Sequence, residues 1–205
     1  MPRSFRTTQH LVTFLCLAAC TGCSRSPAPI PVSPPFKLPS VGEATGTVLR
    51  IGDPFPEIQT VDLDGNPIEF KEQLRHGGYT LVVFWSTTCR FCMQEMPREV
   101  ELAKLYDPLG LRVIGVNSDE TTEIAKAAVE ENDVPWLNVF EGPEYAIAGQ
   151  LGIEIWPTLF LLDREGKVVV TSPLLRATAA EVMSDGSARS VHGLDWALES
   201  LLNHK

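Results

Sequence analysis

Long apolar segments and basic residues are both scarce in this chain of 205 residues, and each shortage excludes a class of protein. No run of about 18 or more apolar residues occurs, so no helix is predicted to span a membrane by itself. Lys and Arg number 17 against 26 Asp and Glu, which gives a formal net charge of −9. Nucleic-acid binding depends on cationic side chains that neutralise phosphates, so this balance argues against it. The balance favours solubility and basic partners without selecting a function.

Histidine and cysteine are also few, with four and five residues respectively, and their spacing argues against a zinc site. A structural zinc ion needs four converging ligands. Cys89 and Cys92 could supply two, but the other closely spaced pair, Cys20 and Cys23, lies near the N-terminus among residues that form no core. The histidines show no ligand spacing and stand at positions 10, 76, 192 and 204. We therefore predict no metal site.

The first 19 residues combine a basic start with a short apolar stretch. Residues 1–6 are positive and free of acids, and residues 11–19 have the length of a signal-peptide hydrophobic region. The stretch ends in Leu17-Ala18-Ala19-Cys20, which resembles the lipobox of bacterial lipoproteins. The resemblance implies a lipoprotein signal peptide over 1–19 and a diacylglycerol on the Cys20 thiol, and two or more acyl chains anchor a protein stably. An ordinary cleaved leader with an incidental cysteine is the alternative.

Residues 20–50 are predicted to form a proline-rich tether. Six prolines fall between Ser24 and Pro39, and almost nothing there could form a core. Proline fixes φ and lacks an N–H group, so the segment should be extended and semi-rigid. At about 3.1 Å per residue it could hold a following domain on the order of 50 Å from a bilayer.

From residue 51 onward strands and helices alternate, and we predict one domain over 51–173. Residues 79–85 form a continuous apolar run, typical of a buried central strand. A turn signature, Asp64-Gly65-Asn66, predicts a hairpin before that strand. Further expected strands are 111–116, 136–140, 158–162 and 167–171, and further expected helices are 121–132, 144–151 and 191–203. This order predicts an α/β sandwich around a mixed sheet, followed by an extension over 174–205 that is predicted to be helical.

Residues 89–106 are predicted to form the helix after the central strand. Its apolar positions recur at helical spacing and include Met93, Met96, Val100 and Leu105. Pro97 lies inside the segment and should bend the helix.

Cys89 and Cys92 stand at the start of this predicted helix. Free backbone N–H groups and the positive end of the helix dipole stabilise a thiolate there. A thiolate on Cys89 can attack a disulfide of another molecule, and Cys92, one turn further on, can resolve the mixed disulfide. Arg90 adds a positive charge that favours the ionised form of Cys89. The pattern predicts a redox-active pair, with a structural disulfide as the alternative.

The segment from Phe84 to Pro97 also carries a family resemblance. Its sequence, Phe-Trp-Ser-Thr-Thr-Cys-Arg-Phe-Cys-Met-Gln-Glu-Met-Pro, is similar to the motif of the membrane-tethered thioredoxin-like proteins TlpA and ResA. The likeness covers roughly residues 52–171 and includes Trp156-Pro157-Thr158. It implies a thioredoxin-like fold, with a central mixed β-sheet flanked by helices and an extra N-terminal β-hairpin. It also implies a thiol–disulfide oxidoreductase with no cofactor beyond a Cys89–Cys92 disulfide.

The resemblance implies roles for further residues. Pro157 matches a cis-proline that packs beside the cysteine pair, and the backbone of Trp156 before it would pair with the client chain. Arg90 and Phe91, between the cysteines, are expected to contribute to docking. Glu95 matches an acidic residue thought to assist substrate recognition or proton transfer, although a glutamate on a solvated helix face is the alternative.

Several positions depart from the family or match it less closely. Glu120 matches a second acidic neighbour of the disulfide, Thr88 replaces the usual Trp, and Phe91 replaces a common Pro. The buried Asp of thioredoxin corresponds to Val83, as in other tethered members. Residues between the cysteines tune the reduction potential over roughly −270 to −120 mV on related folds, so the sequence leaves the potential open.

The leading hypothesis is a membrane-anchored disulfide reductase in an extracytoplasmic or periplasmic space, where disulfides persist. Its expected partners are client proteins with disulfides or thiols. The resemblance implies apocytochrome c as one such client, in cytochrome c biogenesis, and a membrane electron donor of the CcdA or DsbD type.

Two other classes share this fold. A peroxiredoxin needs the pattern Pro-x-x-x-Thr-x-x-Cys, but Val82 and Ser86 occupy the Pro and Thr positions. A Sco-type copper-binding module uses two cysteines separated by three residues and a distant histidine. This chain has two residues between the cysteines, and His192 is its candidate histidine.

Overall fold

The computed structural model of the chain describes residues 49–74, 78–172, 174–176, 178–182 and 188–202. The predicted signal peptide, the lipidation candidate Cys20 and nearly all of the predicted tether lie outside these ranges. The same holds for His10, His76, His204 and Cys23. Among the helices of the described ranges, none is long and apolar enough to cross a membrane.

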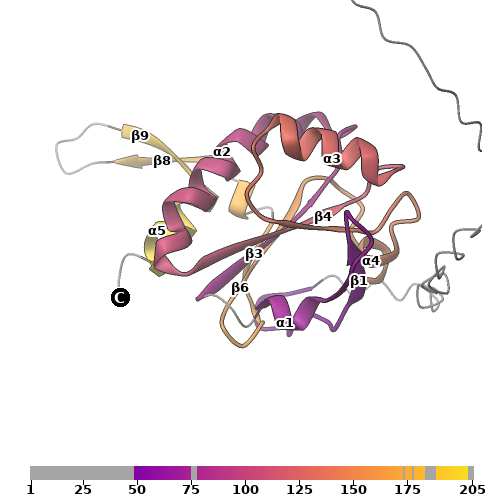
Figure 1. Cartoon of the computed structure of the whole chain (residues 1–205). Helices are drawn as coiled ribbons and strands as arrows, with labels where there is room; N and C mark the ends of the chain where they lie inside the picture. The colour runs from indigo at the N-terminus through magenta and orange to yellow at the C-terminus, as the bar shows by residue number, and fades with distance from the viewer. Residues whose placement is uncertain (1–48, 75–77, 173, 177, 183–187, 203–205) are drawn as a thin grey trace, which may run out of the picture. The chain divides into compact units, whose positions relative to one another are not determined.

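A seven-stranded mixed sheet organises the fold, with the strand order β2-β1-β5-β4-β3-β6-β7 (Figure 1). The strands are Gln59–Asp62 (β1), Pro67–Glu69 (β2), Tyr79–Trp85 (β3), Leu111–Asn117 (β4), Leu137–Phe140 (β5), Thr158–Leu162 (β6) and Val168–Thr171 (β7). Strand β3 lies inside the sheet, parallel to β4 and antiparallel to β6. The β1–β2 hairpin lies at one edge, where β1 pairs antiparallel with β5. The mixed sheet with an N-terminal hairpin confirms the predicted thioredoxin-like fold.

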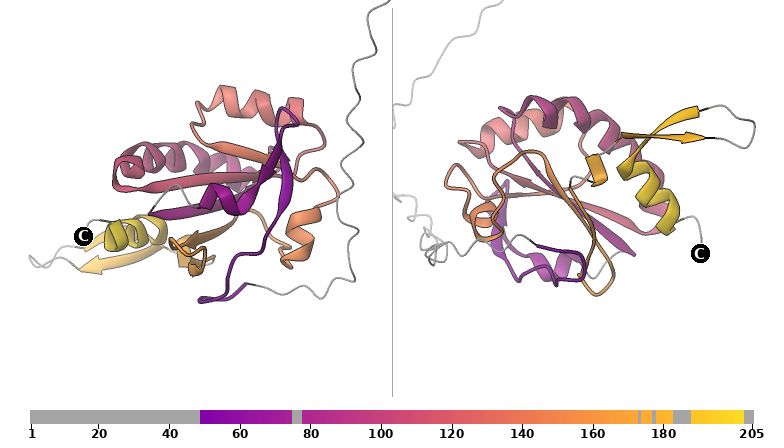
Figure 2. Two further views of the ribbon diagram at one scale, coloured as in Figure 1. Left: turned by 60° about the horizontal axis from the view of Figure 1, so that its bottom comes forward. Right: turned by 180° about the vertical axis from the view of Figure 1, so that it is seen from behind.

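Five α-helices of the described ranges cover the two faces of this sheet (Figures 1 and 2). They are Phe70–Leu74 (α1), Arg90–Tyr106 (α2), Thr122–Glu131 (α3), Ala146–Gln150 (α4) and Gly193–Leu202 (α5). Strand β3 shows why helices cover both faces of the sheet. Its last six residues are all buried, and successive side chains of a strand point to opposite faces. Leu81, Val83 and Trp85 pack with residues of α2, α3 and α5 in one core cluster. Val82 and Phe84 pack with residues of α1 and α4 in a second cluster on the other face.

Helix α2 differs from its sequence prediction in the apolar residues that it buries. Met96 and Val100 are buried as expected, but Leu105 is 64% exposed and contributes little to the core. Ala103 and Tyr106 are buried instead, since they lie on the face that contacts the sheet. The helix runs through Pro97 without interruption.

The C-terminal extension is not wholly helical, contrary to the prediction. It contains a short 3-10 turn, Leu174–Arg176, and a two-stranded antiparallel hairpin of Thr178–Val182 (β8) and Ala188–His192 (β9) before α5. This hairpin forms a sheet of its own, separate from the seven-stranded sheet. Helix α5 packs against α2. The extension places its buried apolar residues in the same cluster as Trp85 and Cys92, namely Leu175, Leu194, Ala197, Leu198 and Leu202.

Candidate active site

Cys89 and Cys92 form a disulfide at the start of α2, with their Cα atoms 5.3 Å apart. Cys89 is the N-cap residue, and its Sγ accepts a hydrogen bond from the backbone N–H of Cys92 at 3.1 Å. Cys89 is half-buried, whereas Cys92 is only 3% exposed and lies in the core beneath the helix. The accessible sulfur is therefore the one that a free helix N–H group can stabilise as a thiolate.

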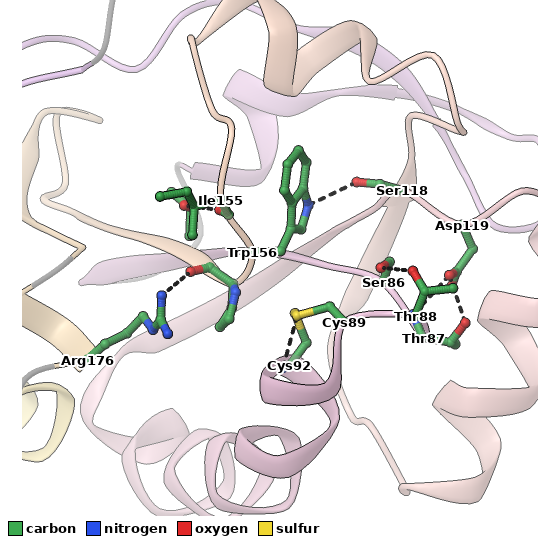
Figure 3. Close-up of a disulfide and its surroundings, with 12 residues drawn as sticks. Ser86, Thr87, Thr88, Cys89, Cys92, Ser118, Asp119, Ile155, Trp156 and Arg176 are labelled. Carbon is green, nitrogen blue, oxygen red and sulfur yellow. Dashed lines mark hydrogen bonds between the residues drawn. A yellow bond between two sulfur atoms is a disulfide. The ribbon is translucent and has the colours of Figure 1, made fainter.

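The loop before Cys89 is held by an aspartate of a neighbouring strand end (Figure 3). Asp119 Oδ1 accepts hydrogen bonds from both the backbone N–H and the hydroxyl of Thr87, each at 2.8 Å. Its Oδ2 accepts a hydrogen bond from Asn117 Nδ2 at 2.8 Å. The resemblance pointed to Glu120 as a second acidic neighbour of the disulfide, after Glu95, and its role stays a prediction; Glu120 is exposed, whereas Asp119 is buried. Asp119 was missed, although its place just after a buried strand could have signalled it.

Trp156 lies in a loop beside the cysteine pair (Figure 3), and Pro157 is the next residue of that loop. The peptide bond between them is cis, and Pro157 is buried. Trp156 and Cys89 both pack against the cluster that contains Cys92. The carbonyl oxygen of Pro157 accepts a hydrogen bond from Arg176 Nη1 at 3.2 Å. The structure therefore brings this loop beside the disulfide and ties it to the C-terminal extension.

Exposed apolar side chains occur between the cysteines and next to the cis-proline loop. Phe91, between the cysteines, is 61% exposed, and Ile155, just before the cis-proline loop, is 68% exposed. Tyr145 is also exposed, and its ring packs on Trp156 with 5.2 Å between ring centroids. The sequence did not single out Ile155 or Tyr145, because nothing local distinguishes them from core residues. Exposed apolar groups around a reactive centre suit contact with a polypeptide client.

Glu95 lies on α2, three residues beyond Cys92, and takes part in a charged cluster. Its Oε2 lies 3.4 Å from Arg98 Nη1 and 3.7 Å from His192 Nε2. Arg98 also contacts Asp195 of α5 at 2.7 Å. Burial and the Arg98 guanidinium lower the pKa of His192, against the opposing charges of Glu95 and Asp195. Glu95 is thus ion-paired rather than simply solvated, and its role in catalysis stays a prediction.

Glu99, one helical turn beyond Glu95, is a titratable group that the sequence analysis overlooked. Burial, together with the negative charge of Glu95, raises its pKa to about 8, and Arg98 opposes this effect. Its position on the buried face of α2, in register with Cys92 and Met96, could have signalled it.

The copper alternative required His192 near the cysteines. In the structure His192 contacts Glu95, and its Nδ1 accepts a hydrogen bond from the backbone N–H of Leu194 at 3.3 Å. Among the described residues, no group of three or more His, Cys, Asp or Glu side chains is arranged to hold a metal ion.

Comparisons with known proteins agree with this geometry. The AhpC/TSA family profile matches residues 51–171. The thiol-disulfide oxidoreductase ResA of Bacillus cereus is 34% identical over 122 residues, which are 59% of this chain and 68% of that protein. A thiol:disulfide interchange protein from a Bacteroides species superposes with a TM-score of 0.59 at 26% identity, over 77% of this chain and 93% of the other. The thioredoxin domain of a thiol-disulfide oxidoreductase from Bacteroides vulgatus superposes with a TM-score of 0.55 at 29% identity. The match covers 60% of this chain and 89% of the other. The chain therefore belongs to the AhpC/TSA family and is a thioredoxin-like thiol–disulfide oxidoreductase.

Proposed function

We propose that this oxidoreductase is an extracytoplasmic reductase of protein disulfides, anchored to a membrane through a lipid on Cys20. The observation that carries the thiol-exchange chemistry is the asymmetry of the cysteine pair, and the reducing direction is proposed from the resemblance to tethered reductases. Cys89 is half-buried at the helix start beside the cis-proline loop, whereas Cys92 is buried behind it. The sulfur of Cys89 can therefore react with a client disulfide, and the sulfur of Cys92 can then resolve the mixed disulfide.

The reaction begins from the dithiol form. The Cys89 thiolate attacks one sulfur of a client disulfide, forms a mixed disulfide and releases the other client sulfur as a thiolate, which takes up a proton. The Cys92 thiolate then attacks Cys89 Sγ, forms the Cys89–Cys92 disulfide and releases the second client thiolate. The client gains two electrons and the enzyme loses two. The reaction would leave the enzyme in its oxidised form, with a Cys89–Cys92 disulfide like the one in this structure.

Docking is assigned to the residues around Cys89. The Trp156–Pro157 loop would pair with the client backbone, and Phe91 would add apolar contact. Arg90, which is also exposed, would favour acidic or polar client groups. Glu95 would assist proton transfer near the sulfurs.

The cellular setting follows from the resemblance and the leader. A membrane electron donor of the CcdA or DsbD type would return the enzyme to its dithiol form. Apocytochrome c, whose haem-binding cysteines must be reduced before haem attachment, is the client we propose.

A trapping experiment tests the proposal. In a Cys92→Ser variant, Cys89 should remain bound to clients as a mixed disulfide that reducing agents release, and a Cys89→Ser variant is the matched control. If Cys92→Ser traps no protein and the wild-type dithiol exchanges with no disulfide, the proposed reductase activity is wrong. The reduction potential of the Cys89–Cys92 pair tests the direction, because a value near about −270 mV favours a reductase and one near about −120 mV an oxidase.

A further inference from the structure

A buried glutamate lies behind the cis-proline loop. Glu141 follows β5 and is only 2% exposed. Its Oε2 accepts hydrogen bonds from the backbone N–H groups of Ile147 and Ala148 in α4, at 2.9 and 2.8 Å. Its Oε1 accepts a hydrogen bond from the hydroxyl of Ser118 at 2.5 Å. One carboxylate thus joins the end of β5, the loop after β4 and the start of α4.

The contacts continue from Ser118 to the loop beside the disulfide. The indole Nε1–H of Trp156 donates a hydrogen bond to Ser118 Oγ at 3.3 Å (Figure 3). An indole N–H can only donate, so Ser118 must accept here and direct its single hydroxyl proton to Glu141. The hydrogen bonds therefore run in one direction, from Trp156 through Ser118 to Glu141.

A second contact leads from the same carboxylate to Trp156. Tyr145 immediately precedes α4 and has a left-handed backbone with φ of 51°. The first turn of α4 is the one whose N–H groups donate hydrogen bonds to Glu141. The Tyr145 ring packs on the Trp156 indole. Glu141 thus holds both the segment whose Tyr145 contacts the indole ring and, through Ser118, the indole nitrogen.

We propose that Glu141 is a positioning residue for client docking, because through Ser118 and α4 it fixes the Trp156 ring and with it the backbone of the cis-proline loop. The inference rests on the proposed docking role of Trp156 and Pro157. A loop that is already ordered loses less conformational freedom when a client chain pairs with it. The benefit should be confined to clients large enough to use the loop.

Two disulfide probes of different size separate positioning from chemistry. The reduced full-length protein is reacted with a cyclic peptide that contains one intramolecular disulfide, and with 5,5′-dithiobis(2-nitrobenzoate), which needs no backbone docking. Glu141→Gln and Ser118→Ala should each lower the rate constant for the peptide about tenfold, as expected for one lost buried hydrogen bond, and leave that for the small disulfide unchanged. Glu144→Gln, at an exposed glutamate of the same segment, is the matched control and should react as wild type.

Further variants test the route. Ser118→Thr retains a hydroxyl and should retain the peptide rate. The Glu141→Gln/Ser118→Ala double variant should be no slower than Glu141→Gln alone, since Ser118 acts on Trp156 through its hydrogen bond to Glu141. Should either substitution impair folding, the indole ¹⁵N–¹H resonance of Trp156 in the remaining variant gives an independent readout. It should shift there and stay unshifted in Glu144→Gln.

Each contrary result has a defined meaning. Unchanged peptide rates, additive losses in the double variant, equal losses with both probes or an unshifted Trp156 resonance would each overturn the positioning role and leave the reductase proposal intact. A wild-type protein that does not react with the peptide disulfide through Cys89 would overturn both.

Discussion

Replacing Glu99 with glutamine should make the stability of the oxidised protein much less dependent on pH. Glu99 is 5% exposed and lies four residues after Glu95 on the buried face of α2. Burial and the charge of Glu95 raise its pKa from 4.5 to about 8, so the folded protein holds a proton there at neutral pH. Glutamine keeps the size and the neutrality of that protonated side chain.

The sign of the effect follows from proton binding. Between pH 4.5 and about 8 the folded state keeps a proton on Glu99 that the unfolded chain has released. Stability falls with rising pH wherever the folded state binds more protons. The contribution of protonated Glu99 to the free energy of unfolding is therefore fully present below pH 4.5 and is lost as pH rises through about 8. The separation of the two pKa values corresponds to roughly 5 kcal/mol at most.

Urea unfolding, followed by tryptophan fluorescence at pH 5, 7 and 9, measures this dependence. Glu99→Gln should match the wild type near pH 5 and exceed it by several kcal/mol at pH 9. Glu101→Gln, at an exposed glutamate of the same helix, is the control, and its free energy of unfolding should change with pH as in the wild type. If the free energy of unfolding changes with pH equally for the wild type and Glu99→Gln, Glu99 is ionised in the folded protein and the reasoning is refuted.

Three further substitutions have defined outcomes. Asp119→Ala should destabilise the protein by about 1–3 kcal/mol and slow the reaction of Cys89, because it removes both hydrogen bonds from Thr87. Glu120→Ala, at an exposed residue, is the control and should change neither quantity in the same urea-unfolding and thiol-exchange assays. Leu198→Ala in α5 should cost about 2–5 kcal/mol in urea unfolding, and the neighbouring exposed Trp196→Ala should cost far less; similar costs would contradict the packing of α5 into the core. Arg176→Ala removes the donor to the cis-proline carbonyl and should slow reaction with a peptide disulfide more than with a small one, so equal slowing would contradict a role in docking.

The central sheet and the cysteine pair could be predicted because their signals are local. The apolar run of β3 spans its observed bounds, Tyr79–Trp85, since a strand buried on both faces needs apolar residues at nearly every position. The start of α2 was placed within one residue, because Cys89 and Cys92 mark the turn after that strand. The Asp64-Gly65-Asn66 turn likewise placed the first hairpin, in which Asp62 Oδ1 accepts the N–H groups of Asp64 and Asn66.

The parts that were missed depend on residues far apart in the chain. Trp156, Ser118 and Glu141 form one hydrogen-bonded route, but 38 residues separate the first two and 23 the last two. Each residue alone is ordinary, and only the folded sheet brings the ends of β4 and β5 to the cis-proline loop. The β8–β9 hairpin was missed for another reason, because it pairs outside the main sheet.

The packing of α5 sets a practical boundary for work on this enzyme. Leu194, Leu198 and Leu202 share a core cluster with Cys92, so the last helix supports the packing around this cysteine. A shortened protein that stops at residue 171, where the family match ends, would expose this packed surface to water. Recombinant versions meant for redox measurements should therefore extend through residue 202, and potentials measured on shorter ones would describe a different molecule.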